Sequence, residues 1–177
     1  MMNSRHSSPL ICMMKTVFIC VFFDLFFMIF FPLISLKWVA VSVTQVAIIF
    51  LSFTVGFAWL PWGILTLQMF HSLFSLEGWA LGTLIGVILC IIMSRLKAMI
   101  QLTGPLSIII TTYFLQVVWC LLAGVLTSLR NHDWKFFQLF AHQGVSYGLV
   151  TAALSPLLFF ILRNIWLVPT NPFDHES

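Results

Sequence analysis

Residues 78–94 read GWALGTLIGVILCIIMS, an apolar run without a single charged side chain. Small residues occupy every fourth position of this run: Gly78, Gly82, Gly86, Cys90 and Ser94. At that spacing they share one face of a helix. Because lipid offers no hydrophobic drive for helices to associate, close contact between small residues helps to hold membrane helices together. The run is therefore typical of a transmembrane helix whose small-residue face packs against a neighbour.

Composition extends this interpretation to the whole chain. Of its 177 residues, 61% are hydrophobic and 7% are charged, whereas about 25% of the residues in an ordinary soluble domain are charged. Each crossing of a bilayer needs about 20 apolar residues, so a chain of this length has room for roughly six crossings and little else. The net charge of +3 is spread thinly along the sequence. That distribution provides no basic patch and argues against a nucleic-acid partner.

The apolar runs and their Pro, Gly and charged boundaries predict an all-α fold, a polytopic membrane protein with six transmembrane helices in a compact bundle. The expected spans cover residues 16–34, 38–58, 62–76, 79–94 and 105–127, with a last span that ends near Trp166. The transmembrane domain 16–166 then lies between an N-terminal segment 1–15 and a C-terminal tail 167–177. Met13 and Met14, just before the first span, offer an alternative start of translation.

The last apolar region is too long for one crossing. As a single helix, residues 135–166 would measure about 48 Å at 1.5 Å per residue. Aromatic and aliphatic residues beside Lys135, Gln138 and His142 predict a short interfacial helix, then a break, with the true span starting near Gln143. The pair Ser155-Pro156 predicts a kink in that span.

Lys and Arg predict the orientation, because they accumulate on the cytoplasmic side of a membrane. With six spans and both termini in the cytoplasm, five basic residues lie inside: Arg5, Lys15, Arg95, Lys97 and Arg163. Three lie outside: Lys37, Arg130 and Lys135. This orientation is the one that the sequence favours.

Polar side chains within the expected spans are candidates for partner or ligand contacts: Asp24, Gln68, His71, Ser72, Thr112 and Gln116. An ionised Asp24 near the middle of the first span costs several kcal/mol unless it is paired or protonated. We expect a hydrogen bond from the Gln68 and His71 face; contact with a helix of another protein and proton coupling are the alternatives. The other polar faces either hydrogen-bond to neighbouring helices or line a small hydrated or ligand-binding cavity.

The sixth span carries a second face of small residues: Gly144, Gly148, Thr151, Ala152 and Ser155. Residues 144–148 also match the GxSxG pattern of serine hydrolases, but that chemistry needs a strained strand-to-helix turn. Close helix packing explains the same letters, and we expect no catalytic residue. His132-Asp133 is too small a set for a metal site, and the four cysteines are scattered without metal or redox spacing. We therefore expect no enzyme, cofactor or metal.

From Pro61 onward, the order of features resembles the MreD family, small bacterial inner-membrane proteins of the rod-shape, cell-wall elongation machinery. The segments that carry the resemblance are 70–78, the basic turn 94–97, Pro105-Leu106, the loop 130–134 and the Pro-Leu-rich stretch 154–163 that ends in Arg163. The family usually has Asp-Leu near the end of the third span, where this chain has His71-Ser72.

The resemblance implies a non-enzymatic subunit of the elongasome that scaffolds other membrane proteins for peptidoglycan synthesis and cell shape. Its implied partners are the lipid bilayer and an MreC-like membrane protein of the cell-wall elongation complex. Members of the family also look like the six-helix substrate-binding subunits of vitamin transporters. That similarity implies an alternative function, a small-molecule binding or transport subunit with an intramembrane pocket.

Overall fold

The computed structural model describes residues 9–33, 42–54, 59–73, 78–97 and 104–166, and within these ranges the chain is helical without strands. The six helices are α1 (Pro9–Leu33), α2 (Val43–Thr54), α3 (Leu60–His71), α4 (Gly78–Leu96), α5 (Pro105–Asn131) and α6 (Lys135–Trp166). Four segments are long and apolar enough to cross a bilayer: Leu10–Phe30, Gly78–Leu96, Pro105–Asn131 and Gly148–Trp166. The expected all-α fold is confirmed, and within the described residues four of the expected spans coincide with helices that could cross a membrane.

The second and third expected spans are short helices within the described residues. Each of α2 and α3 has 12 residues, or about 18 Å at 1.5 Å per residue, against a hydrocarbon layer about 30 Å thick. Residues 34–41, 55–58 and 74–77 lie outside the described residues, so six spans remain a prediction. At the N-terminus, α1 already begins at Pro9 rather than at the expected Thr16.

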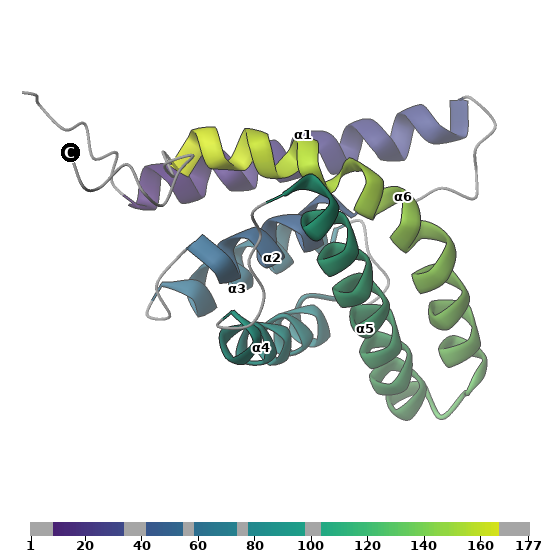
Figure 1. The fold of residues 1–177 in the computed structure, drawn as a ribbon. Coiled ribbons are helices and arrows are strands. Elements are labelled where there is room, and N and C mark those ends of the chain that lie inside the picture. The colour runs from purple at the N-terminus through teal and green to yellow at the C-terminus, as the bar shows by residue number, and fades with distance from the viewer. Residues whose placement is uncertain (1–8, 34–41, 55–58, 74–77, 98–103, 167–177) are drawn as a thin grey trace, which may run out of the picture.

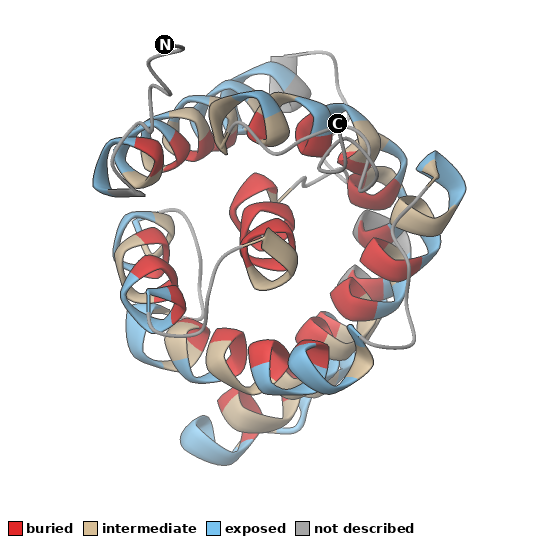
Figure 2. Ribbon diagram, turned by 60° about the vertical axis from the view of Figure 1, so that its left-hand side comes forward, coloured by how far each residue is buried: buried red, intermediate tan, exposed pale blue. Residues whose placement is uncertain are grey.

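Helix α2 lies at the centre of the molecule, and the other helices encircle it in Figure 2. Every residue from Val43 to Leu51 is buried. A helix that is buried on all sides carries mostly apolar residues, and the buried polar residues of α2, Thr44 and Gln45, lie in its first turn. Packing across α2 includes an edge-to-face contact between Phe50 and Phe159 of α6, with ring centroids 5.4 Å apart.

Helix α6 first runs antiparallel to α5 and then bends to lie beside α1 (Figure 1). Its C-terminal end is bonded to α1 at two points. The Cys12 thiol donates to the Ile165 carbonyl oxygen at 3.4 Å, and the Trp166 indole nitrogen donates to the Thr16 hydroxyl at 3.0 Å. The first and last helices of the described chain therefore form one surface of the bundle.

The break expected near Gln143 is absent, because α6 is continuous from Lys135 to Trp166. Its first aromatic residues pack on α5: atoms of Phe137 and Phe140 come within 3.1–3.3 Å of where a Cβ on Gly124 would lie. Pro156 lies inside the helix, where a missing N–H normally frees a carbonyl and favours a bend. The Ser155 hydroxyl donates to the freed Ala152 carbonyl at 2.7 Å.

Two glycines of the 78–94 stripe let α4 approach its neighbours closely. A Cβ on Gly82 would collide with the Gln68 side chain of α3, and one on Gly86 would lie 2.7 Å from Cγ2 of Ile64. Gly78 differs, since no described atom lies within 4 Å of its would-be Cβ. Its φ of +75° instead gives it a conformational role where the chain enters α4. The packing role that we expected for Gly78 is therefore replaced by a backbone role.

The small residues of α6 face α5. A Cβ on Gly144 would lie 2.8 Å from Cβ of Cys120, and one on Gly148 would lie 3.3 Å from Cγ of Gln116. Ala152, one turn further, is also buried. Because Cβ of Cys120 is fixed to its backbone, the contact at Gly144 cannot relax by a side-chain rotation.

We predict that Gly144→Ala destabilises the protein. The methyl group would force α5 and α6 apart, and overpacking of this kind costs about 1–3 kcal/mol, partly offset by up to about 1 kcal/mol of better helix propensity. Gly104→Ala is the control, because no atom lies within 4 Å of its would-be Cβ. Denaturant titration in detergent micelles measures both. A Gly144→Ala protein as stable as the control would contradict the close contact.

Candidate functional site

The buried carboxylate of Asp24 joins three helices. Its side chain in α1 is 7% exposed and accepts hydrogen bonds at both oxygens. Oδ1 accepts from the Val43 backbone N–H at 3.1 Å, and Oδ2 accepts from the Thr44 hydroxyl at 2.8 Å. Nδ1 of His71, at the end of α3, lies 3.2 Å from Oδ2. The structure thus brings Asp24 and His71 together, as the sequence suggested for this carboxylate.

The same carboxylate caps the start of α2. The first N–H groups of any helix have no partner within the helix, and they carry the positive end of its dipole. Here the Val43 N–H is satisfied by Asp24 from another helix, and the Gln45 N–H by the hydroxyl of Ser42 at 3.4 Å. A negative charge at this end is stabilising. Asp24 therefore accepts the hydrogen bond from the start of α2 that water would accept in a soluble protein.

His71 gives the carboxylate a second partner of opposite character. It lies in the last turn of α3, where a positive charge is favoured by the helix dipole. Its side chain is 11% exposed, and the pair is an ion pair whenever the imidazole is protonated. Among the described residues Asp24 is thus shared between α2 and α3, which leaves it little freedom to bind an external cation.

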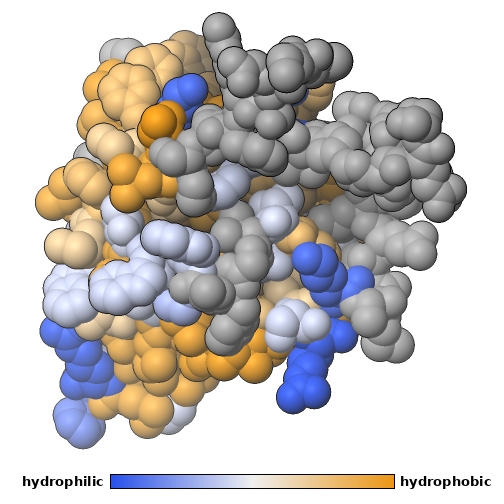
Figure 3. Space-filling model, turned by 90° about the vertical axis from the view of Figure 1, so that its left-hand side faces the viewer, coloured by the Kyte–Doolittle hydropathy of each residue, from blue (hydrophilic) through white to orange (hydrophobic). Residues whose placement is uncertain are grey.

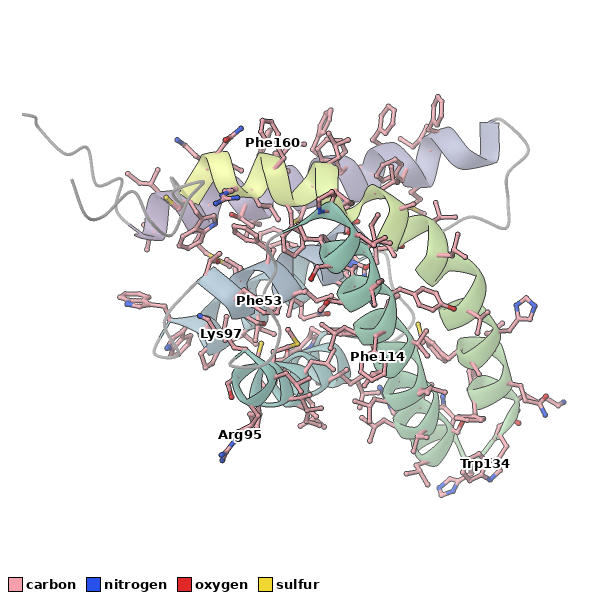
Figure 4. The ribbon with its side chains drawn as sticks, in the orientation of Figure 1. Phe53, Arg95, Lys97, Phe114, Trp134 and Phe160 are labelled. Carbon is pink, nitrogen blue, oxygen red and sulfur yellow. The ribbon has the colours of Figure 1, made fainter. Side chains whose placement is uncertain are left out.

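Lys97 holds the opposite end of α2. Its ammonium group, just after α4, donates to the Phe53 carbonyl oxygen in the last turn of α2 at 2.6 Å, and Figure 4 shows the two residues together. The last carbonyls of a helix lack internal partners and attract positive charge. The hydroxyl of Ser52 and the thiol of Cys90 lie 2.8 Å apart nearby. Both ends of α2 are therefore bonded to side chains of other helices.

The remaining polar candidates fall in different places. Gln68 lies over Gly82 between α3 and α4, and its amide nitrogen has no hydrogen-bond partner within the part of the chain that the structure describes. Ser72 is partly exposed and donates to the Met69 carbonyl of its own helix. Thr112 and Gln116 are buried in α5, and among the described residues neither the hydroxyl of Thr112 nor the amide oxygen of Gln116 has a partner.

An apolar cavity of about 140 Å³ opens between the starts of α1 and α3 and the ends of α2 and α6. Its lining consists of Leu10, Met13, Leu51, Trp59, Leu60, Trp62, Gly63, Thr66 and Trp166. The only hydroxyl among these residues, that of Thr66, donates to the Trp62 carbonyl of its own helix at 2.8 Å. A pocket of this character suits a hydrocarbon group better than a polar substrate.

Apart from Asp24, the charged side chains of the described residues lie toward the ends of helices. Figure 3 shows one face of the molecule. On its described part, the strongly hydrophilic residues occupy only a few small areas. Figure 4 places Arg95 and Lys97 far from Trp134 at the α5–α6 turn. In that turn, Asp133 accepts a hydrogen bond from the Lys135 N–H at 2.9 Å, and His132 adopts a left-handed conformation that ends α5.

The GxSxG letters lie within a continuous helix. Gly144 and Gly148 pack on α5, and the backbone of residues 144–148 makes no strand-to-helix turn. No group of three His, Cys, Asp or Glu side chains within the described residues is placed to hold a metal ion. The polar network around α2 is therefore the most developed arrangement of functional groups in the described chain.

Comparisons with protein-family models, curated proteins and solved structures find no match for this chain. Inferences about function therefore depend on its own residues and their geometry.

We predict that Asp24→Leu severely destabilises the protein. The change leaves the Val43 N–H, the Thr44 hydroxyl and His71 without their shared acceptor, and breaking a buried pair costs about 3–5 kcal/mol. Asp133→Leu, the same change in the exposed turn, should cost about 1 kcal/mol. Asp24→Asn, which keeps one acceptor oxygen, should fall between them. Unfolding titrations in micelles compare the three, and equal losses for the two leucine variants would contradict the capping role.

We predict a smaller but measurable loss for Lys97→Met. Removing the ammonium group leaves the Phe53 carbonyl without that donor, and a charge at an exposed helix end contributes about 0.3–1 kcal/mol. Arg95→Met, in the same basic turn, is the matched control and should leave stability unchanged within error. Added salt should weaken the difference, because exposed charges are screened. Indistinguishable unfolding curves for the two variants at low salt would count against the bond to α2.

Proposed function

We propose that this chain is a non-enzymatic membrane subunit that docks other membrane proteins, and that it acts as an MreD-like member of the cell-wall elongation complex in the bacterial inner membrane. Its partner would be an MreC-like membrane protein. The proposal rests on the pattern resemblance and on one structural observation, an outward aromatic stripe on α1. In this proposal the two short helices complete a six-span bundle with both termini in the cytoplasm, similar to the substrate-binding subunits of vitamin transporters.

The aromatic stripe consists of Phe18, Phe22 and Phe26 on α1, with exposed fractions of 73%, 56% and 44%. Residues four apart lie on one face of a helix, so these rings form a continuous row. Phe160 of the adjoining α6 is 63% exposed and projects beside α1 in Figure 4. The exposed residues of α4 and α5 are mainly aliphatic, such as Leu84 and Ile110. Five exposed phenylalanines lie on the surface that α1 and α6 share, and the other exposed aromatic residues of the described chain are spread over α3, α4, α5 and the α5–α6 turn.

A row of rings suits recognition better than simple contact with lipid. Aromatic side chains provide large contact areas and lose little rotamer entropy on binding, and they are enriched in protein interfaces. On α1 the rings of Phe26 and Phe30 stack with centroids 5.2 Å apart and planes inclined by 13°. Such stacking holds the row in shape before a partner arrives. We infer that a transmembrane helix of the partner lies against this row.

Segments that carry the resemblance fall at helix ends in the structure. The basic turn ends α4, Pro105 begins α5, the loop 130–134 joins α5 to α6, and Arg163 lies in the last turn of α6. These positions are compatible with the order of spans in the proposed family. They support the proposal without testing its partners.

Co-purification in mild detergent tests the docking proposal. We predict that the wild-type chain recovers an MreC-like protein from native membranes, and that Phe22→Ala combined with Phe160→Ala reduces that recovery several-fold. Phe114→Ala is the matched control, because Phe114 is 59% exposed but projects from α5, away from the stripe (Figure 4). Recovery of the wild-type chain without a partner, together with normal cell shape after deletion of its gene, would overturn the proposal.

A further inference from the structure

Seven buried side chains in the described structure carry a polar atom without a hydrogen-bond partner, and three of them are Gln68 of α3 and Thr127 and Ser128 near the end of α5. The other four lie on α2, α5 and α6. They are the amide oxygens of Gln45 in α2 and Gln116 in α5, and the hydroxyls of Thr112 in α5 and Thr151 in α6. Gln45 and Gln116 are 5% exposed, and the two threonines are 0% exposed. Inside a bilayer an unsatisfied polar atom has no bulk water to bond with, so each of these atoms is costly.

The two threonines, like Thr127, lack a hydrogen bond that several other threonines of the described chain make. A threonine in a helix can satisfy its hydroxyl by donating to the carbonyl four residues earlier. Thr16, Thr54 and Thr83 make this bond at 2.6–2.9 Å. Thr112 and Thr151 do not. Their hydroxyls are therefore available to a partner outside their own helices.

The register of α5 and α6 brings Thr112 and Thr151 to one level. Gly144 lies against Cys120, and Gly148 lies against Gln116. Each step of four residues forward in α6 thus matches a step of four backward in α5, as expected for antiparallel helices. The next step places the 151–152 turn of α6 opposite Thr112, one turn from Gln116.

Gln45 of α2 lies near the level of Thr112 and Thr151. The end of α2 lies beside the starts of α1 and α3, because Leu51 and Met13 both lie within 4 Å of a would-be Cβ on Gly63. The end of α6 also reaches the start of α1, so α2 and the last part of α6 run in the same direction. Phe50 contacts Phe159, and Gln45 therefore lies about one turn before that contact, toward Thr151.

We propose that Gln45, Thr112, Gln116 and Thr151 form an intramembrane site for a small uncharged molecule that both donates and accepts hydrogen bonds. The four groups are two amides and two hydroxyls, and none of them is charged. They match a hydroxyl, an amide or a water molecule better than an ion. Water is one source of that chemistry, and a hydroxyl- or amide-bearing metabolite is the other. The site is independent of the docking surface on α1, which lies on the outside of the bundle.

The test uses the full chain in lipid nanodiscs and the double variant Thr112→Val with Thr151→Val. Valine keeps the shape of threonine and removes the hydroxyl. With a bound guest the double variant should melt several degrees below wild type, because hydrogen bonds to the guest are lost. Thr83→Val is the control, since that hydroxyl is already bonded to the Trp79 carbonyl, and it should leave both Tm and occupancy unchanged.

Occupancy is measured on the wild-type protein, so the test does not depend on the variant folding. Magnetisation transfer from water to the Thr112 and Thr151 signals in solid-state NMR reports bound water, and native mass spectrometry of membrane extracts reports a stoichiometric metabolite. Either signal supports the site and identifies its source. The proposal is overturned if both signals are absent, or if the double variant melts above wild type, as expected when a costly unpaired hydroxyl is removed.

Discussion

The hydrogen bonds that Asp24 accepts at the start of α2 are the constraint on which the rest of the fold depends. Like any helix, α2 (12 residues) leaves its first N–H and last C=O groups without partners of its own, and within a bilayer such groups need partners from the protein. Asp24 supplies an acceptor at one end, and Lys97 supplies a donor at the other. With both ends bonded, a short apolar helix can occupy the centre of the bundle and provide the surface against which the others pack.

Placing α2 at the centre has consequences for the surrounding helices. Asp24 must reach α2 from α1, and His71 must reach Asp24 from α3, so these helices are fixed relative to one another by one carboxylate. The glycines of α4 and α6 then set how closely the outer helices approach, since side chains of α3 and α5 fill the space over Gly82, Gly86, Gly144 and Gly148. Polar bonding positions the inner helices, and small residues determine the spacing of the outer ones.

The sequence predicts the presence of the helices and their packing faces better than it predicts helix lengths and contacts between helices. Apolar runs and the four-residue spacing of glycines predict helices and close contacts because both depend on local periodicity. That Asp24 requires a partner follows from the cost of a buried charge, but that the partner is the start of α2 depends on a tertiary contact that no local pattern encodes. Ser42 followed by Gln45 is a capping-box pattern that could have located the start of α2. The break expected in α6 is absent. Phe137 and Phe140 at its start pack on α5, a tertiary contact that local composition does not encode.

A rigid docking surface requires that the helix carrying it is fixed by contacts on its inner side. Helix α1 meets this requirement, because its middle is bonded to α2 and α3 through Asp24, and its first turns are bonded to the end of α6 through Cys12 and Thr16. Thr16 and Asp24 are buried on the inner side of α1, and Phe18, Phe22 and Phe26 lie on its outer side. The carboxylate of Asp24 thus fixes the orientation of α1 relative to α2 and α3. Fixing that orientation keeps one face of the bundle rigid and aromatic toward the membrane.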